Sequence, residues 1–204
     1  MIFRGKLYLI VYEKSGYRRK YTPLHVIGKI GGIRENEKII YVTANPNIRR
    51  KEYQEKIKEI LDSKNIIIRF LVVDNFKQHL LLINILWRYL NQKTNINTSI
   101  VIDSMIYVFL TSFEEEVVFM DREIELMEQV AMLKHTAMKY NVPIYIVSYL
   151  HGDKPILWKL FERYVDEIIE VRYIEEEIIL IRKNRLLEEI EKIVYEVEEN
   201  IEEN

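Results

Sequence analysis

The chain has 204 residues, 49% of them hydrophobic and 30% charged, which fits a single domain over residues 1–204 with a substantial core. It has no cysteine, which excludes disulfides, thiol catalysis and zinc-thiolate sites. The 30 basic and 32 acidic residues give a net charge of −2, which makes no overall case for nucleic-acid binding. With no bilayer-spanning apolar run and no signal-peptide stretch, we expect a soluble cytoplasmic protein.

Apolar runs and helical periodicity alternate along the first three quarters of the chain. Runs rich in β-branched and aromatic residues predict strands at 6–12, 38–43, 66–73, 99–103 and 143–149. Apolar residues at helical spacing predict helices at 49–61, 76–90 and 115–140. This alternation is typical of an α/β domain with a largely parallel sheet.

The last quarter changes character after a polar break at 151–155. A short helix is expected at 156–164, followed by strands at 167–173 and 176–182 that form an antiparallel hairpin. The segment 186–204 could form an amphipathic helix, yet residues 193–197 alternate as a strand does, and we favour a strand there.

The loop after the first strand lacks the motif of a nucleotide-binding site. A P-loop needs GxxxxGK followed by Ser or Thr, whereas only Gly16 is present here. Depending on the register, Arg18 and Arg19 or Arg19 and Lys20 stand at the lysine and hydroxyl positions. We therefore expect no ordinary ATP site.

The same loop interleaves aromatic and basic side chains. Tyr17, Arg18, Arg19, Lys20 and Tyr21 could hold phosphate or a single-stranded DNA backbone and stack on its bases. The alternative is a solvated turn whose tyrosines cover the space where a nucleotide would otherwise lie.

Several segments carry motifs of a known type of ATPase core. The apolar strand that ends in Asp103-Ser104 looks like a Walker B element, although many parallel strands end in a loop-capping aspartate. Residues 5–10, 141–147 and 165–170 are similar to the lead into a P-loop, a "yn-v-p" turn and an "aD-i-ie" strand. Together these segments resemble the core of the RecA/RadA superfamily, which includes RadB and KaiC-like proteins. The resemblance implies a RecA-like three-layer core with a mostly parallel central sheet and a C-terminal antiparallel hairpin.

The chain departs from the family pattern at the positions that take part in ATP hydrolysis. Asn45 stands where such ATPases carry the glutamate that activates water, and an amide cannot accept that proton. Ser148-Tyr149 replaces the "N-Q" sensor of the γ-phosphate. Together with the degenerate Walker A loop, these changes predict a pseudo-ATPase with no catalytic residue, no cofactor and no metal.

Lys183 and Arg185 resemble the K-x-R finger of KaiC-like, RadB-like and helicase members, which reaches a neighbouring subunit's ATP. The alternative is that two basic side chains at a strand end simply face water.

The resemblance thus implies a non-catalytic accessory or regulatory paralogue in DNA recombination and repair. Its expected partner is a RadA/RecA-type recombinase or a second copy of itself, with single-stranded DNA as a further candidate. One alternative is a KaiC-like ATPase that binds ATP and Mg²⁺ through Arg18, Arg19 and Asp103. Another is a RecA-fold scaffold in an unrelated assembly.

Overall fold

The structure is a computed structural model. It describes residues 5–13, 22–45, 55, 57, 65–92, 97–103, 105–111, 118–174 and 177–196, with the backbone alone at 118–121 and 196. Most of the helix predicted at 49–61 lies outside these residues, although Glu55 and Ile57 are both helical.

Strands and helices alternate as predicted. In chain order the elements are β1 (Leu7–Tyr12), α1 (Pro23–Lys29), β2 (Lys38–Thr43), β3 (Ile67–Val72), α3 (Phe76–Asn91), β4 (Thr98–Ile102), α4 (Met105–Leu110), α5 (Val118–Tyr140), β5 (Ile144–His151), β6 (Lys154–Pro155), α6 (Trp158–Phe161), β7 (Glu167–Ile174), β8 (Glu177–Asn184) and β9 (Glu189–Glu196). The predicted strands are confirmed with small shifts in their ends. The helix expected at 156–164 is shorter, and α1, α4 and β6 were not predicted.

One sheet holds all the strands of the described residues, in the order β3-β2-β4-β5-β1-β7-β8-β9, with β6 paired to β5. The neighbouring strands in β3-β2-β4-β5-β1-β7 pair in parallel. The pairs β7–β8, β8–β9 and β5–β6 are antiparallel. The mostly parallel sheet is therefore confirmed. The C-terminal hairpin is present as β7 and β8, and β9 extends it, so the preference for a strand near the C-terminus was correct.

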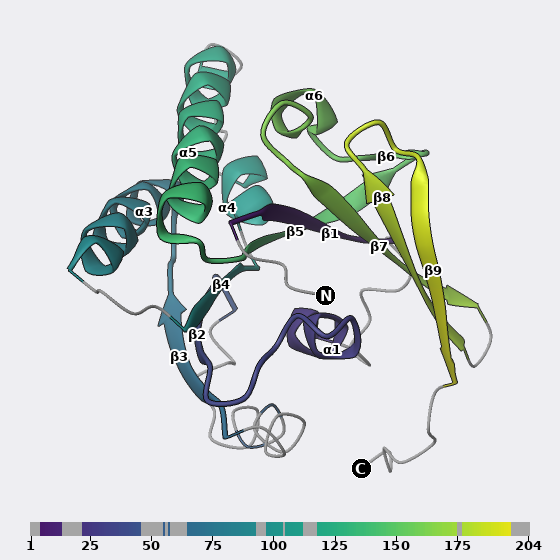
Figure 1. Ribbon diagram of the computed structural model, residues 1–204. Helices are drawn as coiled ribbons and strands as arrows, with labels where there is room; N and C mark the ends of the chain where they lie inside the picture. The colour runs from purple at the N-terminus through teal and green to yellow at the C-terminus, as the bar shows by residue number, and fades with distance from the viewer. Residues whose placement is uncertain are drawn as a thin grey trace.

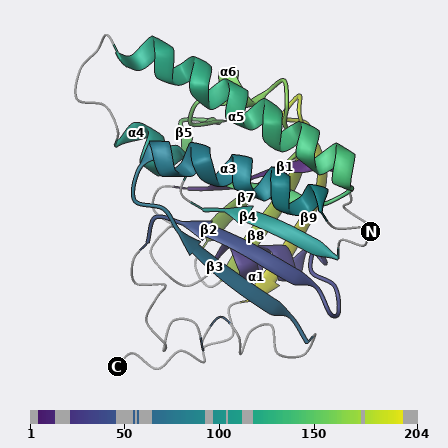
Figure 2. The ribbon, with the colours of Figure 1, turned by 90° about the vertical axis from the view of Figure 1, so that its left-hand side faces the viewer.

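Helices cover both faces of the sheet, as Figures 1 and 2 show. Along β1, Leu7, Leu9 and Val11 belong to the core beneath α3, α4, α5 and α6, whereas Tyr8 and Ile10 face α1. Strands buried on both faces read as continuous apolar runs, which is why the sequence predicted them well. None of the helices in the described ranges is both long and apolar enough to cross a bilayer.

Candidate functional site at the carboxyl ends of the parallel strands

The carboxyl ends of β1, β2 and β4 form the edge where open parallel sheets bind ligands. Tyr12 ends β1, Thr43 ends β2, and Asp103 follows β4 directly. The Asp103 backbone N–H donates to the carbonyl of Val42 at 2.8 Å, which fixes the aspartate beside β2. Ser104, which with Asp103 makes up the expected Walker B element, lies outside the described residues.

The Asp103 side chain is held by a tyrosine. The hydroxyl of Tyr41, on β2, donates a hydrogen bond to Asp103 Oδ2 at 2.6 Å. The other carboxyl oxygen, Oδ1, is buried and has no hydrogen-bond partner among the described residues. A buried polar atom of this kind calls for an explanation, and an ion or water is one.

Burial raises the pKa of the Asp103 carboxyl to about 7, against the opposing effect of the Tyr41 hydrogen bond. Near neutral pH the group is therefore divided between its neutral and ionised forms. Magnesium prefers ionised carboxylates, so this environment does not favour the cation unless the cation itself drives off the proton.

The start of α1, the helix after β1, fits a capped helix end better than a phosphate-binding one. Pro23 opens α1 and has no N–H, and the Thr22 N–H donates to His25 Nδ1 at 3.0 Å. Burial, with a smaller contribution from Lys29, lowers the pKa of His25 to about 4, so the ring is neutral and can accept this hydrogen bond. The imidazole therefore occupies the start of the described helix.

The residues expected to form a degenerate Walker A loop lie outside the described residues: Tyr17, Arg18, Arg19, Lys20 and Tyr21. Their roles in phosphate or DNA contact stay predictions.

Asn45 and Ser148 lie on different parts of this edge. The Asn45 N–H donates to Thr43 Oγ1 at 3.1 Å, next to the end of β2. Ser148 is fully buried on β5, and strand alternation places it on the face beneath α3 and α5, because Ile146 lies on that face and Val147 on the other. Asp103 bonds to Tyr41 on the α1 face, so Ser148 and Asp103 are not brought together.

The two residues of the expected K-x-R finger, Lys183 and Arg185, differ in their surroundings. Lys183, on β8, forms an ion pair with Glu170 of its own chain, and its side chain is 18% exposed. Arg185 is exposed in the turn before β9. The β8 strand is four steps along the sheet from β4, or about 19 Å at about 4.8 Å per step. Within one chain, Lys183 and Asp103 therefore belong to separate regions.

Sequence reasoning missed a partly buried ion network that joins Lys6, just before β1, to side chains of β7, β8 and β9. Arg182, whose side chain is 7% exposed, pairs with Glu167 at 2.8 Å and also with Glu191, while Lys6 pairs with Glu167 from β1's side. On the other face Glu170 pairs with Arg172 and Lys183. The charges Glu167, Glu170, Arg182 and Lys183 are visible in the sequence, but their pairing requires the β7–β8 register.

The pKa values of the carboxyl groups in this network shift in the opposite direction to the pKa of Asp103. Burial alone would raise the pKa of Glu167, but hydrogen bonds and charges from Lys6 and Arg182 outweigh burial and lower it. The pKa of Glu170 is lowered in the same way: burial would raise it, but Lys183 and Arg172 together outweigh burial. These carboxylates are ionised at neutral pH and serve the fold.

The described side chains contain no group of three or more His, Asp or Glu residues placed to hold a metal ion. No protein-family model matches the chain, and no curated protein matches it significantly.

Proposed function

We propose that the chain is a non-catalytic RecA/RadA-type paralogue that serves as an accessory or regulatory protein in DNA recombination and repair. It acts by binding a RadA-type recombinase, and single-stranded DNA is a second candidate ligand through the basic loop at 17–21. It does not hydrolyse ATP.

The observation that carries the proposal is the start of α1. A P-loop ATPase offers phosphate the backbone N–H groups of the loop and of the helix that follows. Here that helix opens at Pro23, and the neutral His25 ring accepts the N–H of Thr22. The Asn45 amide and the partly protonated Asp103 further support the absence of hydrolysis.

A second candidate, a nucleotide-binding KaiC-like protein, is favoured by one feature. Asp103 Oδ1 is buried without a partner in the described part of the chain, and a magnesium ion at the end of β4 would give it one. Binding would then have to ionise a carboxyl group with a pKa of about 7.

The test of the accessory role uses a purified RadA-type recombinase from the same cell. Adding the protein should change ATP turnover or filament lifetime of the recombinase on single-stranded DNA. Arg185→Ala should weaken the effect, whereas Arg163→Ala, which removes another exposed arginine, should not. If wild-type protein leaves both quantities unchanged at saturating concentration, the proposal fails.

A further inference from the structure

The strand β9 forms one edge of the sheet and has an open side. It pairs with β8 and, within the described residues, with no other strand, and Figure 1 shows it at the end of the sheet. Every second residue of such a strand directs its N–H and C=O away from the sheet. The strand is 8 residues long and contains no proline, so its backbone can pair along its whole length. The open side is therefore a template for a further strand.

The backbone of β9 is already held in place from one face of the sheet. Glu191 forms an ion pair with the buried Arg182 of β8, and the Tyr195 hydroxyl donates to the carbonyl of Lys29 at 2.8 Å. Ile193 and Tyr195 also pack against the core beneath α1. A strand that pairs with β9 would therefore have to order only itself, which lowers the entropic cost of the contact.

The other face of β9 presents apolar side chains to solvent. Ile190 is 53% exposed and Val194 is 47% exposed, and Lys192 lies between them on the same face. Cross-strand neighbours on one face of a sheet stabilise each other when both are β-branched or aromatic. A strand added beside β9 would therefore bury these two side chains if it carried apolar residues opposite them.

Acidic residues lie at both ends of β9. The exposed Glu188 and Glu189 stand at its start, and Glu196 at its end pairs with the exposed Glu177 of β8. Lys192 is the only basic residue within the strand. Two copies of β9 aligned over their full length would place Glu189 beside Glu196 if antiparallel and beside Glu189 if parallel, and like charges opposite each other are destabilising. The charges therefore favour a basic strand over a second copy of this chain.

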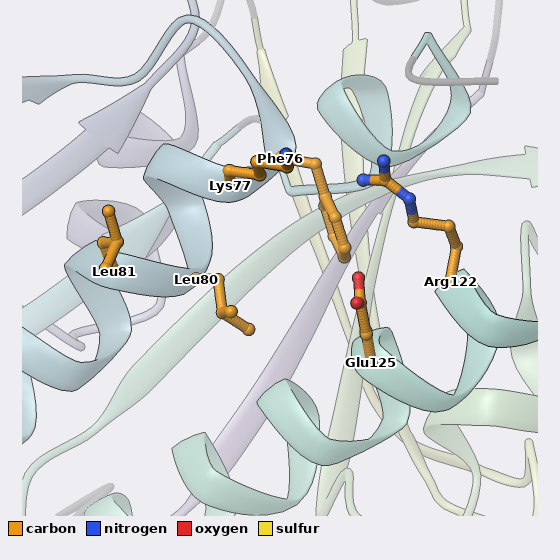
Figure 3. A pocket seen from close by; sticks show the side chains of 6 residues that line it. All are labelled: Phe76, Lys77, Leu80, Leu81, Arg122 and Glu125. Atoms are coloured by element: carbon orange, nitrogen blue, oxygen red, sulfur yellow. The ribbon is translucent and has the colours of Figure 1, made fainter. Parts of the chain in front are cut away.

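A groove between the first turns of α3 and α5 also exposes apolar side chains, but its charges are mixed. It has a volume of about 380 Å³, and its lining residues are Phe76, Lys77, Leu80, Leu81, Arg122 and Glu125. Figure 3 shows Arg122 and Glu125 both reaching from α5 toward the Phe76 ring. Both walls are helices, whose backbone groups are already paired within the helix. The groove thus offers neither an open backbone nor one sign of charge, and it serves as the comparison for β9.

We propose that β9 accepts a basic strand of another polypeptide, which extends the sheet by pairing with the open side of β9. Cationic residues near the two ends of that strand lie close to the glutamates at the ends of β9, and its apolar centre lies beside Ile190 and Val194. Backbone pairing gives the contact its affinity, and the charges select the partner. The contact goes beyond the proposed function, because it needs neither a nucleotide nor DNA.

The probe is the synthetic peptide acetyl-KKVTVTVKK-amide, and acetyl-EEVTVTVEE-amide is its matched control with the same apolar centre and the opposite charge. Fluorescence anisotropy of each labelled peptide is measured against the full chain. One strand covers less area than a standard interface of about 1,600 Å², so we expect a dissociation constant of about 10 μM to 1 mM for the basic peptide. The acidic peptide should bind at least about tenfold more weakly, and salt should narrow the difference.

Amide hydrogen exchange distinguishes strand addition from charge attraction alone. Outward-facing amides of β9 should exchange about tenfold more slowly at about 90% saturation with the basic peptide, since only the free fraction exchanges. Amides of α3 should keep their rates. Binding of the basic peptide without protection in β9 overturns the inference.

Two variants alter the open side of β9, and each has a control elsewhere. Val194→Lys places a cation beside the expected apolar centre of the added strand and should weaken binding at least about tenfold, whereas Leu81→Lys, at a 61% exposed leucine of the α3–α5 groove, should change it less than about twofold. Glu189→Lys should weaken binding at least about threefold, and Glu128→Lys on the exposed side of α5 should not. Circular dichroism and melting temperature establish that all four fold as the wild type does.

The remaining outcomes would assign the edge to something else. Equal affinities of the two peptides overturn the inference, as does binding that Leu81→Lys removes and Val194→Lys retains, because the peptide would then lie in the α3–α5 groove. Sedimentation velocity of the wild-type chain alone completes the test. Self-association that Val194→Lys abolishes would show that a second copy occupies β9, and it would also overturn the inference.

Discussion

Two buried carboxyl environments in this molecule differ in a way that separates fold from candidate site. Glu167 and Glu170 lie in the β7–β8 part of the sheet, where each has two cationic partners and a lowered pKa. Asp103 lies at the end of β4 with a neutral tyrosine donor, and burial raises its pKa to about 7. The former stabilise the sheet in their ionised forms, whereas ionising the latter costs stability.

The largest loss of stability should come from breaking the ion network. Arg182→Met leaves Glu167 nearly buried with Lys6 as its remaining cation, and should lower the free energy of unfolding by about 3 kcal/mol. Urea unfolding at pH 7 measures this. The exposed Arg163→Met should change stability by less than about 0.5 kcal/mol. An equally small change for Arg182→Met would remove the structural role assigned to the network.

Asp103→Asn should instead increase the free energy of unfolding, and it should do so only at high pH. The carboxyl ionises near pH 4 when unfolded but near pH 7 when folded, so the folded state binds more protons between these values. Stability from this group is therefore present at acid pH and lost as pH rises toward 7, by up to about 1.4 kcal/mol per pH unit.

The variant should match wild type near pH 4 and exceed its free energy of unfolding by about 4 kcal/mol at pH 8. Urea titrations across this range provide the measurement, with Asp153→Asn in the exposed turn after β5 as the control. Glu167 and Glu170 contribute with the other sign, since their lowered pKa values give stability that is lost only as pH falls below the usual glutamate range. A pH-independent difference would contradict the burial argument.

The two residues of the expected finger, Lys183 and Arg185, should differ in how much they contribute to stability. Lys183→Ala removes a cation from the buried Glu170 and should cost about 1 kcal/mol, whereas Arg185→Ala should cost less than about 0.5 kcal/mol. Thermal unfolding of both variants tests this. Equal losses would mean that the ion pair of Lys183 contributes nothing, and a loss for Arg185 would reveal a structural role for the turn.

The smallest effect concerns the start of α1. His25→Ala removes the acceptor of the Thr22 N–H and should destabilise the protein by about 0.5 to 1 kcal/mol. The control is His135→Ala on the exposed side of α5. If both variants melt together, the imidazole is not a cap and the α1 terminus is free for another ligand.

The sequence predicted the parallel strands because their apolar runs are long and β-rich, and it predicted β9 from alternation. It missed α1, a short helix directly after the loop interpreted as a degenerate P-loop, although Thr22 followed by Pro23 is a helix-start signal. It missed α4 because Met105–Leu110 is apolar nearly all round and shows no periodicity.

Within the candidate site the sequence identified Asp103 but not its partner. Tyr41 is 62 residues away, and only the β2–β4 pairing places its hydroxyl at the carboxyl group. Likewise, the ion pair of Lys183 with Glu170 depends on the β7–β8 register, which local patterns do not specify.

The measurement that tests the central claim most directly is thermal unfolding with and without ATP and Mg²⁺. A ligand at 100 times its dissociation constant would stabilise the folded state by about 2.7 kcal/mol, which raises the melting temperature by roughly 5 to 10 °C. We predict no shift with ATP or ADP for the wild-type protein. A shift that needs Mg²⁺ and disappears in Asp103→Asn would contradict the account, because it would show a working nucleotide site at the end of β4.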